Sequence, residues 1–104
     1  MAKVIRDSES VEIQSRFGAN TAGTFGTFAA SDTTPSVATG NLWKTHASSQ
    51  ALTTFDDGTP GQIITVISTA AVTYDVTSTP LKGGSVDLVT ASGDVTNWVY
   101  DGTN

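Results

Sequence analysis

The sequence predicts a small all-β protein, either a β-sandwich or a partly open barrel, and three observations favour this fold. Thr occurs eighteen times in 104 residues, and its β-branched side chain suits a pleated, half-exposed surface better than a helix. Short apolar segments recur about every ten residues, a spacing typical of sandwiches and barrels. Gly, Pro, Asp and Asn separate these segments, and each of these residue types favours a turn.

Six short strands are expected in the last two-thirds of the chain. Each is an apolar or alternating segment that ends at turn-forming residues. The expected strands are residues 41–45, 51–55, 62–68, 71–76, 85–90 and 95–100. The third has a near-continuous apolar run, Ile63-Ile64-Thr65-Val66-Ile67. We therefore expect it in the centre of the core, with both of its faces buried.

Two parts are expected along the chain, with residues 34–104 forming the β module and residues 1–33 an N-terminal arm or linker. Within the first part Val11, Ile13 and Phe17 alternate with polar residues, which predicts a strand at 10–17. Residues 18–41 are rich in Gly, Ala, Thr and Ser and have the composition of a loop or weak strand. This segment either links into the module or lies on a neighbouring subunit.

Two glycine-containing turns are expected to need a positive φ. They are Asp56-Asp57-Gly58 and Gly83-Gly84; we expect a positive φ at Gly58 and at one or both of the paired glycines. Asp56 and Asp57 together suggest a general acid/base pair or a calcium site. The further oxygen ligands of a calcium loop are missing, so we expect both carboxylates to cap backbone amides.

The net charge is −5, and it lies in the second half of the chain. Residues 53–104 hold Lys82 against six aspartates, whereas the charges of residues 1–52 cancel. An acidic surface repels phosphate backbones, so nucleic-acid binding is not expected, and neither is contact with anionic membranes. No apolar run reaches the length of a membrane span and no hydrophobic signal core precedes the first charges. We expect a soluble protein without membrane insertion, not exported by the usual route.

Association is expected to stabilise this chain. Only 38% of the residues are hydrophobic, there is no Cys, and the one His has no metal-ligand cluster around it. Domains with so light a core are usually stabilised by disulfides, metals or association, and only association remains here. The composition therefore predicts an oligomer with no cofactor and no metal site.

No catalytic residue is expected. His46 has no Ser or Cys nucleophile motif near it, so the parts of a triad or zinc site are missing, and we expect a surface His at a strand end. Gly83-Gly84 and the pair Gly58 and Gly61 could suggest phosphate-binding loops, but neither is followed by the Lys-Ser/Thr sequence and the helix that bind phosphate. They are expected to be turns.

The aromatic side chains have two possible uses. Large aromatics in a small β domain usually pack in the core or at a subunit interface, but an exposed aromatic face beside Asp, Asn and Gln suits sugar stacking. Alternation places Trp98 and Tyr100 on one face of their strand. The candidate ligand-binding residues are Trp43, Tyr74, Trp98 and Tyr100, and Phe55 belongs to the same aromatic set.

The order of several motifs resembles the C-terminal β module of bacteriophage tail spikes and tail fibres. These motifs are Thr34-Pro35-Ser36-Val37, Asn41-Leu42-Trp43-Lys44-Thr45, Phe55-Asp56-Asp57-Gly58, Gly61-Gln62-Ile63-Ile64-Thr65, Leu81-Lys82-Gly83-Gly84 and Val99-Tyr100-Asp101-Gly102-Thr103. The resemblance implies an intertwined homotrimer, a location in the virion, and a role in trimer assembly or contact with a bacterial surface glycan. Such modules commonly continue with a further Trp and a closing strand, so we expect a shortened form here.

Two competing functions remain open. One is a monomeric carbohydrate-binding module. The other is an enzyme fragment, which ranks low because no catalytic set is present.

Overall fold

The computed structural model describes residues 25–104, and every regular element in this range is a β-strand. The strands are β1 (Gly26–Thr27), β2 (Leu42–Lys44), β3 (Gln50–Leu52), β4 (Ile63–Ile67), β5 (Val72–Tyr74), β6 (Leu88–Thr90) and β7 (Val95–Val99). The expected all-β class is therefore confirmed. The predicted strand at 10–17 lies outside the described residues.

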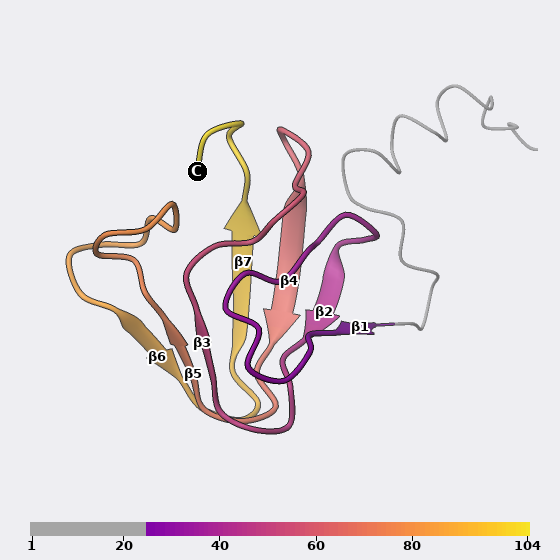
Figure 1. The fold of residues 1–104 in the computed structure, drawn as a ribbon, viewed down its shortest axis with the longest axis vertical. Coiled ribbons are helices and arrows are strands. Elements are labelled where there is room, and N and C mark those ends of the chain that lie inside the picture. The colour runs from indigo at the N-terminus through magenta and orange to yellow at the C-terminus, as the bar shows by residue number, and fades with distance from the viewer. Residues whose placement is uncertain (1–24) are drawn as a thin grey trace, which may run out of the picture.

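Two mixed sheets make up the described fold (Figure 1). The four-stranded sheet has the order β1-β2-β4-β7, in which β1, β2 and β4 are parallel and β7 is antiparallel to β4. The three-stranded sheet has the order β3-β5-β6, with β3 and β5 parallel and β6 antiparallel to β5. This arrangement is a β-sandwich, one of the two forms that the sequence predicted.

The chain passes repeatedly between the two sheets. It leaves the four-stranded sheet after β2, forms β3 in the other sheet, returns for β4, crosses again for β5 and β6, and ends with β7 beside β4. Parallel neighbours need such crossovers, because a tight hairpin can only join antiparallel strands. Each sheet is thus completed by strands from both halves of the module.

The first strand lies earlier in the chain than the expected start of the module at residue 34. Gly26 and Thr27 pair with Trp43 and Lys44, and Phe28 is 3% exposed. A weak strand was one of the two expectations for residues 18–41, but its position could not be predicted, because β1 is two residues long and stands in a stretch of small residues.

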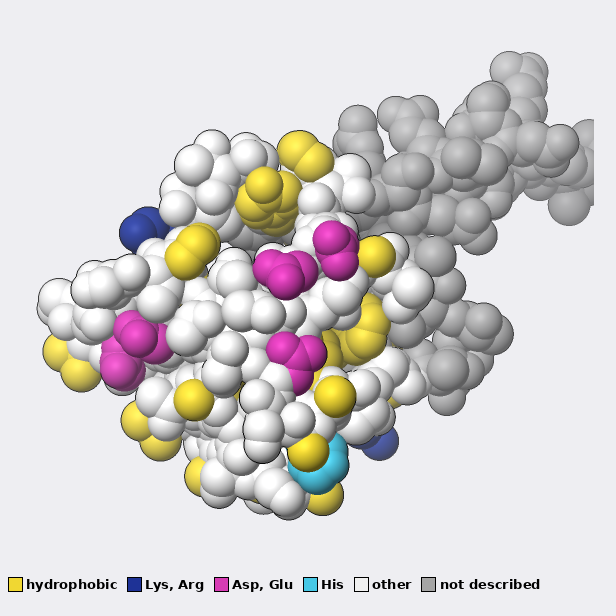
Figure 2. Space-filling model, in the orientation of Figure 1, with side chains coloured by type: hydrophobic (Ala, Val, Ile, Leu, Met, Phe, Trp, Pro, Cys, Tyr) yellow, Lys and Arg dark blue, Asp and Glu magenta, His cyan; other side chains and the backbone are white. Residues whose placement is uncertain are grey.

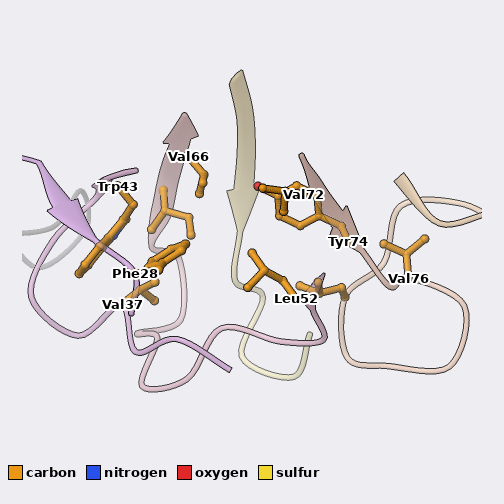
Figure 3. Close-up of a cluster of buried hydrophobic side chains, with 10 residues drawn as sticks. Phe28, Val37, Trp43, Leu52, Val66, Val72, Tyr74 and Val76 are labelled. Atoms are coloured by element: carbon orange, nitrogen blue, oxygen red, sulfur yellow. The ribbon is translucent and has the colours of Figure 1, made fainter. Parts of the chain in front are cut away.

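The core lies between the sheets and has a row of aromatic rings through it. Phe28 stacks on Trp43 with ring centroids 5.4 Å apart, and Phe55 bridges from Phe28 to Tyr74 at 6.0 and 6.4 Å. Figure 3 shows two groups within this core, one around Trp43 and Phe28 and the other around Leu52 and Tyr74. Aromatic rings fill much of a core that has few large aliphatic side chains.

Strand β4 departs from one prediction. It lies between β2 and β7 within its sheet, and Ile64 and Val66 are buried at 4% and 0% exposure. Ile63, however, is 42% exposed. The expectation that both faces are buried is wrong, because among the described residues no second layer covers the outer face of this sheet.

The turn at Asp56-Asp57-Gly58 also differs from the prediction. The positive φ of 64° belongs to Asp57, and Gly58 is not among the residues with positive φ. Aspartate tolerates this conformation better than most residues. Glycine at position 58 instead leaves room for a ring, since a Cβ atom there would make a tight contact of 3.2 Å with Cδ2 of Tyr100. At the other expected turn Gly84 has a φ of 128°, as predicted.

Backbone hydrogen bonds hold the same turn against residues 35–37. The Asp56 N–H donates to Pro35 O at 2.9 Å, and the Asp56 carbonyl accepts from the Val37 N–H at 2.9 Å. Side-chain capping, expected of Asp56 and Asp57, is instead provided by Asp32, Asp75, Asp94 and Asp101.

Candidate functional site

A pocket of about 640 Å³ opens where β7 ends. Its walls come from the segment before and within the Asp56-Asp57-Gly58 turn, from residues 80–82, and from the C-terminal residues 99–104. These segments lie far apart in the sequence and meet at one end of the sandwich, the end at which β7 and the C-terminus lie in Figure 1. This is the candidate binding site of the described chain.

Aromatic rings form the apolar wall of the pocket. Phe55, Trp98 and Tyr100 line it and are each half-buried. Trp98 packs against Phe55 with ring centroids 5.7 Å apart and against Tyr74 at 4.9 Å. The Trp98 indole N–H donates to Thr96 Oγ1 at 2.8 Å, so the ring is fixed from behind by the core.

Tyr100 is held by both its backbone and its hydroxyl. Its N–H donates to Gln62 O at 3.0 Å, its carbonyl accepts from the Gly61 N–H at 2.7 Å, and its hydroxyl donates to Gly102 O at 2.9 Å. The ring lies against Gly58, where the missing side chain leaves room for it. The turn after β3 and the end of β7 thereby form one rigid edge of the pocket.

Three carboxylates surround this aromatic wall: Asp56, Asp57 and Asp101. The backbone N–H groups of Asn104 and Thr103 both donate to Asp101 Oδ1 at 2.7 Å. These bonds, that of Asn104 first, hold the pKa of the Asp101 carboxyl below its ordinary value because they favour its charged form. On the face of the molecule that Figure 2 shows, several acidic side chains lie with hydrophobic side chains among them.

Buried Gln62 forms the floor of the pocket. Its Nε2 donates to Val37 O and Gly40 O, both at 2.9 Å, and its Oε1 accepts from the Thr59 N–H at 2.9 Å. Sequence reasoning assigned Gln62 only to the start of a strand. A signal did exist, since an amide side chain at the end of an apolar strand can bond to turns on either side.

Four candidate ligand-binding residues were expected, and the structure brings two of them together. Trp98 of β7 and Tyr100, the residue after the end of β7, both line the pocket, in agreement with the predicted alternation. Trp43 and Tyr74 are in the core, at 6% and 0% exposure. In this fold they support the aromatic wall from behind and do not offer a ring face to solvent.

Tyr74 is tied into the core by its hydroxyl as well as its ring. The hydroxyl lies 3.2 Å from Thr96 Oγ1, and in Figure 3 it points toward the strand beside it. Burial raises the pKa of the Tyr74 hydroxyl, against smaller opposing effects of hydrogen bonds with Thr96, Ser68 and Trp98. A neutral, hydrogen-bonded phenol is the stable form at this position.

The chemistry of the pocket suits binding. Its lining residues include no His; His46 lies outside it, just after β2, where its Nδ1 accepts from the Ser48 N–H at 3.0 Å. The Lys82 ammonium group donates to Thr79 O at 2.9 Å. Among the described residues no group of three or more His, Cys, Asp or Glu side chains could hold a metal ion.

Comparison with known proteins found no match on which a function could be based. No protein-family model, no curated protein and no solved structure matches this chain. In residues 25–104, no helix is long and apolar enough to cross a membrane.

Proposed function

We propose that this chain is a non-enzymatic module of a phage tail fibre or tail spike, located in the virion, which forms a homotrimer and binds a bacterial surface glycan. The observation on which the binding proposal depends is the pocket in which Trp98, Tyr100 and Phe55 stand beside three carboxylates. The order of the sequence motifs supports the assignment to a virion appendage.

Sugars match both halves of this lining. A pyranose ring offers an apolar C–H face that can pack on an aromatic ring, and its hydroxyls can donate to carboxylates. A volume of about 640 Å³ also lies within the range of about 300–1,000 Å³ that is usual for small-ligand sites.

The charge of the pocket selects among glycans. Asp56, Asp57 and Asp101 line it and Lys82 is the one cation in its lining. Like charges placed side by side disfavour binding. The preferred ligand is therefore a neutral sugar, and sialylated or sulfated glycans are rejected.

Weak binding at one site is sufficient in such a module. Three chains present three equivalent pockets, and linked sites raise the avidity through effective concentration without new contacts. No catalytic group is needed for this role.

A monomeric carbohydrate-binding module is the second candidate, because an aromatic wall beside carboxylates suits a sugar whether or not the chain associates. The two candidates make the same prediction for the ligand and differ in mass. Light scattering on the full chain separates them, since a trimer gives three times the 10.7 kDa of one chain.

Tyr100→Ala tests the pocket, with Tyr100→Phe as the matched control. Each protein is applied to an array of neutral, sialylated and sulfated glycans after circular dichroism has shown that it is folded. We expect the wild type to bind neutral glycans, Tyr100→Phe to retain binding because the ring is kept, and Tyr100→Ala to lose it at least tenfold. A wild type that binds no glycan, or a Tyr100→Ala variant that binds as well as the wild type, would refute the proposed site.

A further inference from the structure

The outer face of the four-stranded sheet has an ordered pattern of exposed side chains. β4 and β7 pair in register, with Ile63 opposite Val99, Thr65 opposite Asn97 and Ile67 opposite Val95. The two apolar pairs stand on either side of the polar pair, in which Thr65 Oγ1 donates to Asn97 Oδ1 at 2.7 Å. Leu42 of β2 continues this face, opposite Thr65.

These apolar side chains are unusually exposed for a sheet. Ile63 is 42% exposed, Val95 54% and Val99 65%. They lie on adjacent strands and form one strip, and contiguous apolar surface of this kind marks an interaction site more often than scattered exposed residues do. We call this strip, made of Ile63, Thr65, Ile67, Val95, Asn97 and Val99, the β4–β7 face.

The distribution of charge in the chain indicates which partner covers the β4–β7 face. Neither β4 nor β7 contains a charged residue, although the whole chain has a net charge of −5. On the neighbouring strand β2 the Nζ atom of Lys44 lies over the Phe25 ring, 5.3 Å from its centroid. Copies of an acidic chain repel one another over most of their surface, and an uncharged face lets two copies approach with little of that cost.

The polar pair lowers the cost of burial in part. Polar groups are costly to bury when they lose their hydrogen bonds; Thr65 Oγ1 and Asn97 Oδ1 already bond to each other, and the Asn97 amide N–H groups would need acceptors on the partner copy. With strands about 4.8 Å apart and a rise of about 3.4 Å per residue, the five-residue strands β4 and β7 have a footprint of roughly 160 Å². This strip is the centre of a contact that surrounding residues must complete, since a stable interface buries about 800 Å² per partner.

We propose that the β4–β7 face is the surface through which copies of this chain associate. The inference rests on the oligomeric module proposed above; apart from Val99, which also lines the pocket, it uses none of the residues argued to bind the glycan. It also accounts for a composition with a light core and no disulfide, since the buried face would add apolar contacts that a single chain lacks.

Light scattering on charge variants of the full chain tests this surface. Val95→Glu and Ile63→Glu place a carboxylate on the β4–β7 face, and Val89→Glu is the matched control, since Val89 is 67% exposed on β6 of the other sheet. We expect the wild type and Val89→Glu to share a mass of several chains, and both face variants to fall to one chain. A wild-type mass of one chain overturns the inference, and so do face variants that keep the wild-type mass. A Val89→Glu variant that falls to one chain also overturns it, because Val86, Leu88 and Val89 are exposed too and the contact would then lie at β6.

A labelling experiment keeps the proposal testable if the charge variants do not fold. The chain has no Cys, so Val95→Cys and Val89→Cys each introduce a single thiol. In the oligomer we expect a maleimide to react at least tenfold more slowly at position 95 than at position 89, and equal rates would contradict the proposed surface. A wild type that has a mass of several chains but binds no glycan would refute the pocket and leave the β4–β7 face intact.

Discussion

Replacing Gln62 with Leu should lower the stability of this protein more than any comparable change at its surface. Gln62 is 5% exposed and its amide makes three hydrogen bonds to backbone groups, those of Val37, Gly40 and Thr59. Leucine has a similar volume but can make none of these bonds.

The three hydrogen bonds of Gln62 do not contribute equally to the free energy of unfolding. Gly40 O also accepts from the Trp43 indole N–H at 3.1 Å, so it keeps a partner, and Thr59 is exposed, so its N–H can bond to water. Val37 is 3% exposed, and its carbonyl would lose the bond that Gln62 supplies. An unsatisfied buried group costs about 1–3 kcal/mol and an ordinary hydrogen bond contributes about 0.5–1.5 kcal/mol. We therefore expect the free energy of unfolding to fall by about 2–4 kcal/mol.

Urea denaturation at a fixed protein concentration measures this change, since association makes stability depend on concentration. Thr59→Val is the matched control: it lies in the same turn, keeps its backbone N–H and should change the free energy by less than about 0.5 kcal/mol. If Gln62→Leu also stayed within that margin, the three bonds would not stabilise the fold as argued.

Two further predictions concern the core. In Gly26→Ala, the new Cβ would lie 2.3 Å from Cζ3 of buried Trp43, so overpacking should lower the free energy of unfolding by about 1–3 kcal/mol. Gly83→Ala, whose Cβ would lie 3.4 Å from Val76, is the mild control in the same thermal denaturation experiments. Equal losses of stability in the two variants would contradict the argument. Because the Tyr74 pKa is raised by burial, the unfolded chain ionises first above about pH 10 and stability falls there as pH rises. A pH series on Tyr74→Phe should show a shallower alkaline decline than the wild type, and parallel curves would rule out this contribution.

The strands of this fold could be predicted wherever their side chains alternate or form an apolar run. The strongest such pattern, Ile63–Ile67, is β4 at its expected place. How many faces of it are buried could not be predicted, because burial depends on whether another layer covers the sheet. Ile63 looks identical to Ile64 in the sequence, yet the two point to opposite faces.

The turns show a second limit of sequence reasoning. Asp57 adopts the positive φ that was assigned to Gly58, and Gly58 instead lies against the ring of Tyr100, more than forty residues later. A constraint between distant segments leaves no local trace. The same holds for the buried amide of Gln50, whose Nε2 donates to Ala29 O and Asp32 O.

Two of the four candidate ligand-binding residues could be placed together from the sequence. Period-2 alternation was enough to place Trp98 and Tyr100 together, and both line the pocket. Nothing in the sequence distinguishes them from Trp43 and Tyr74, which also stand on alternating strands. Only the packing of the two sheets decides which rings lie inside and which line the opening.

The alternation of the chain between its two sheets has a consequence for how the protein is made. β4 is flanked by β2 and β7, and its pairing joins Leu42 to Thr65 and Ile63 to Val99. A ribosome must therefore synthesise β7 before β4 has both neighbours, whereas all strands of the β3-β5-β6 sheet precede β7 in the chain. Pairings between segments so far apart in the sequence form slowly. The four-stranded sheet is thus the part of the described fold that must wait for the last strand.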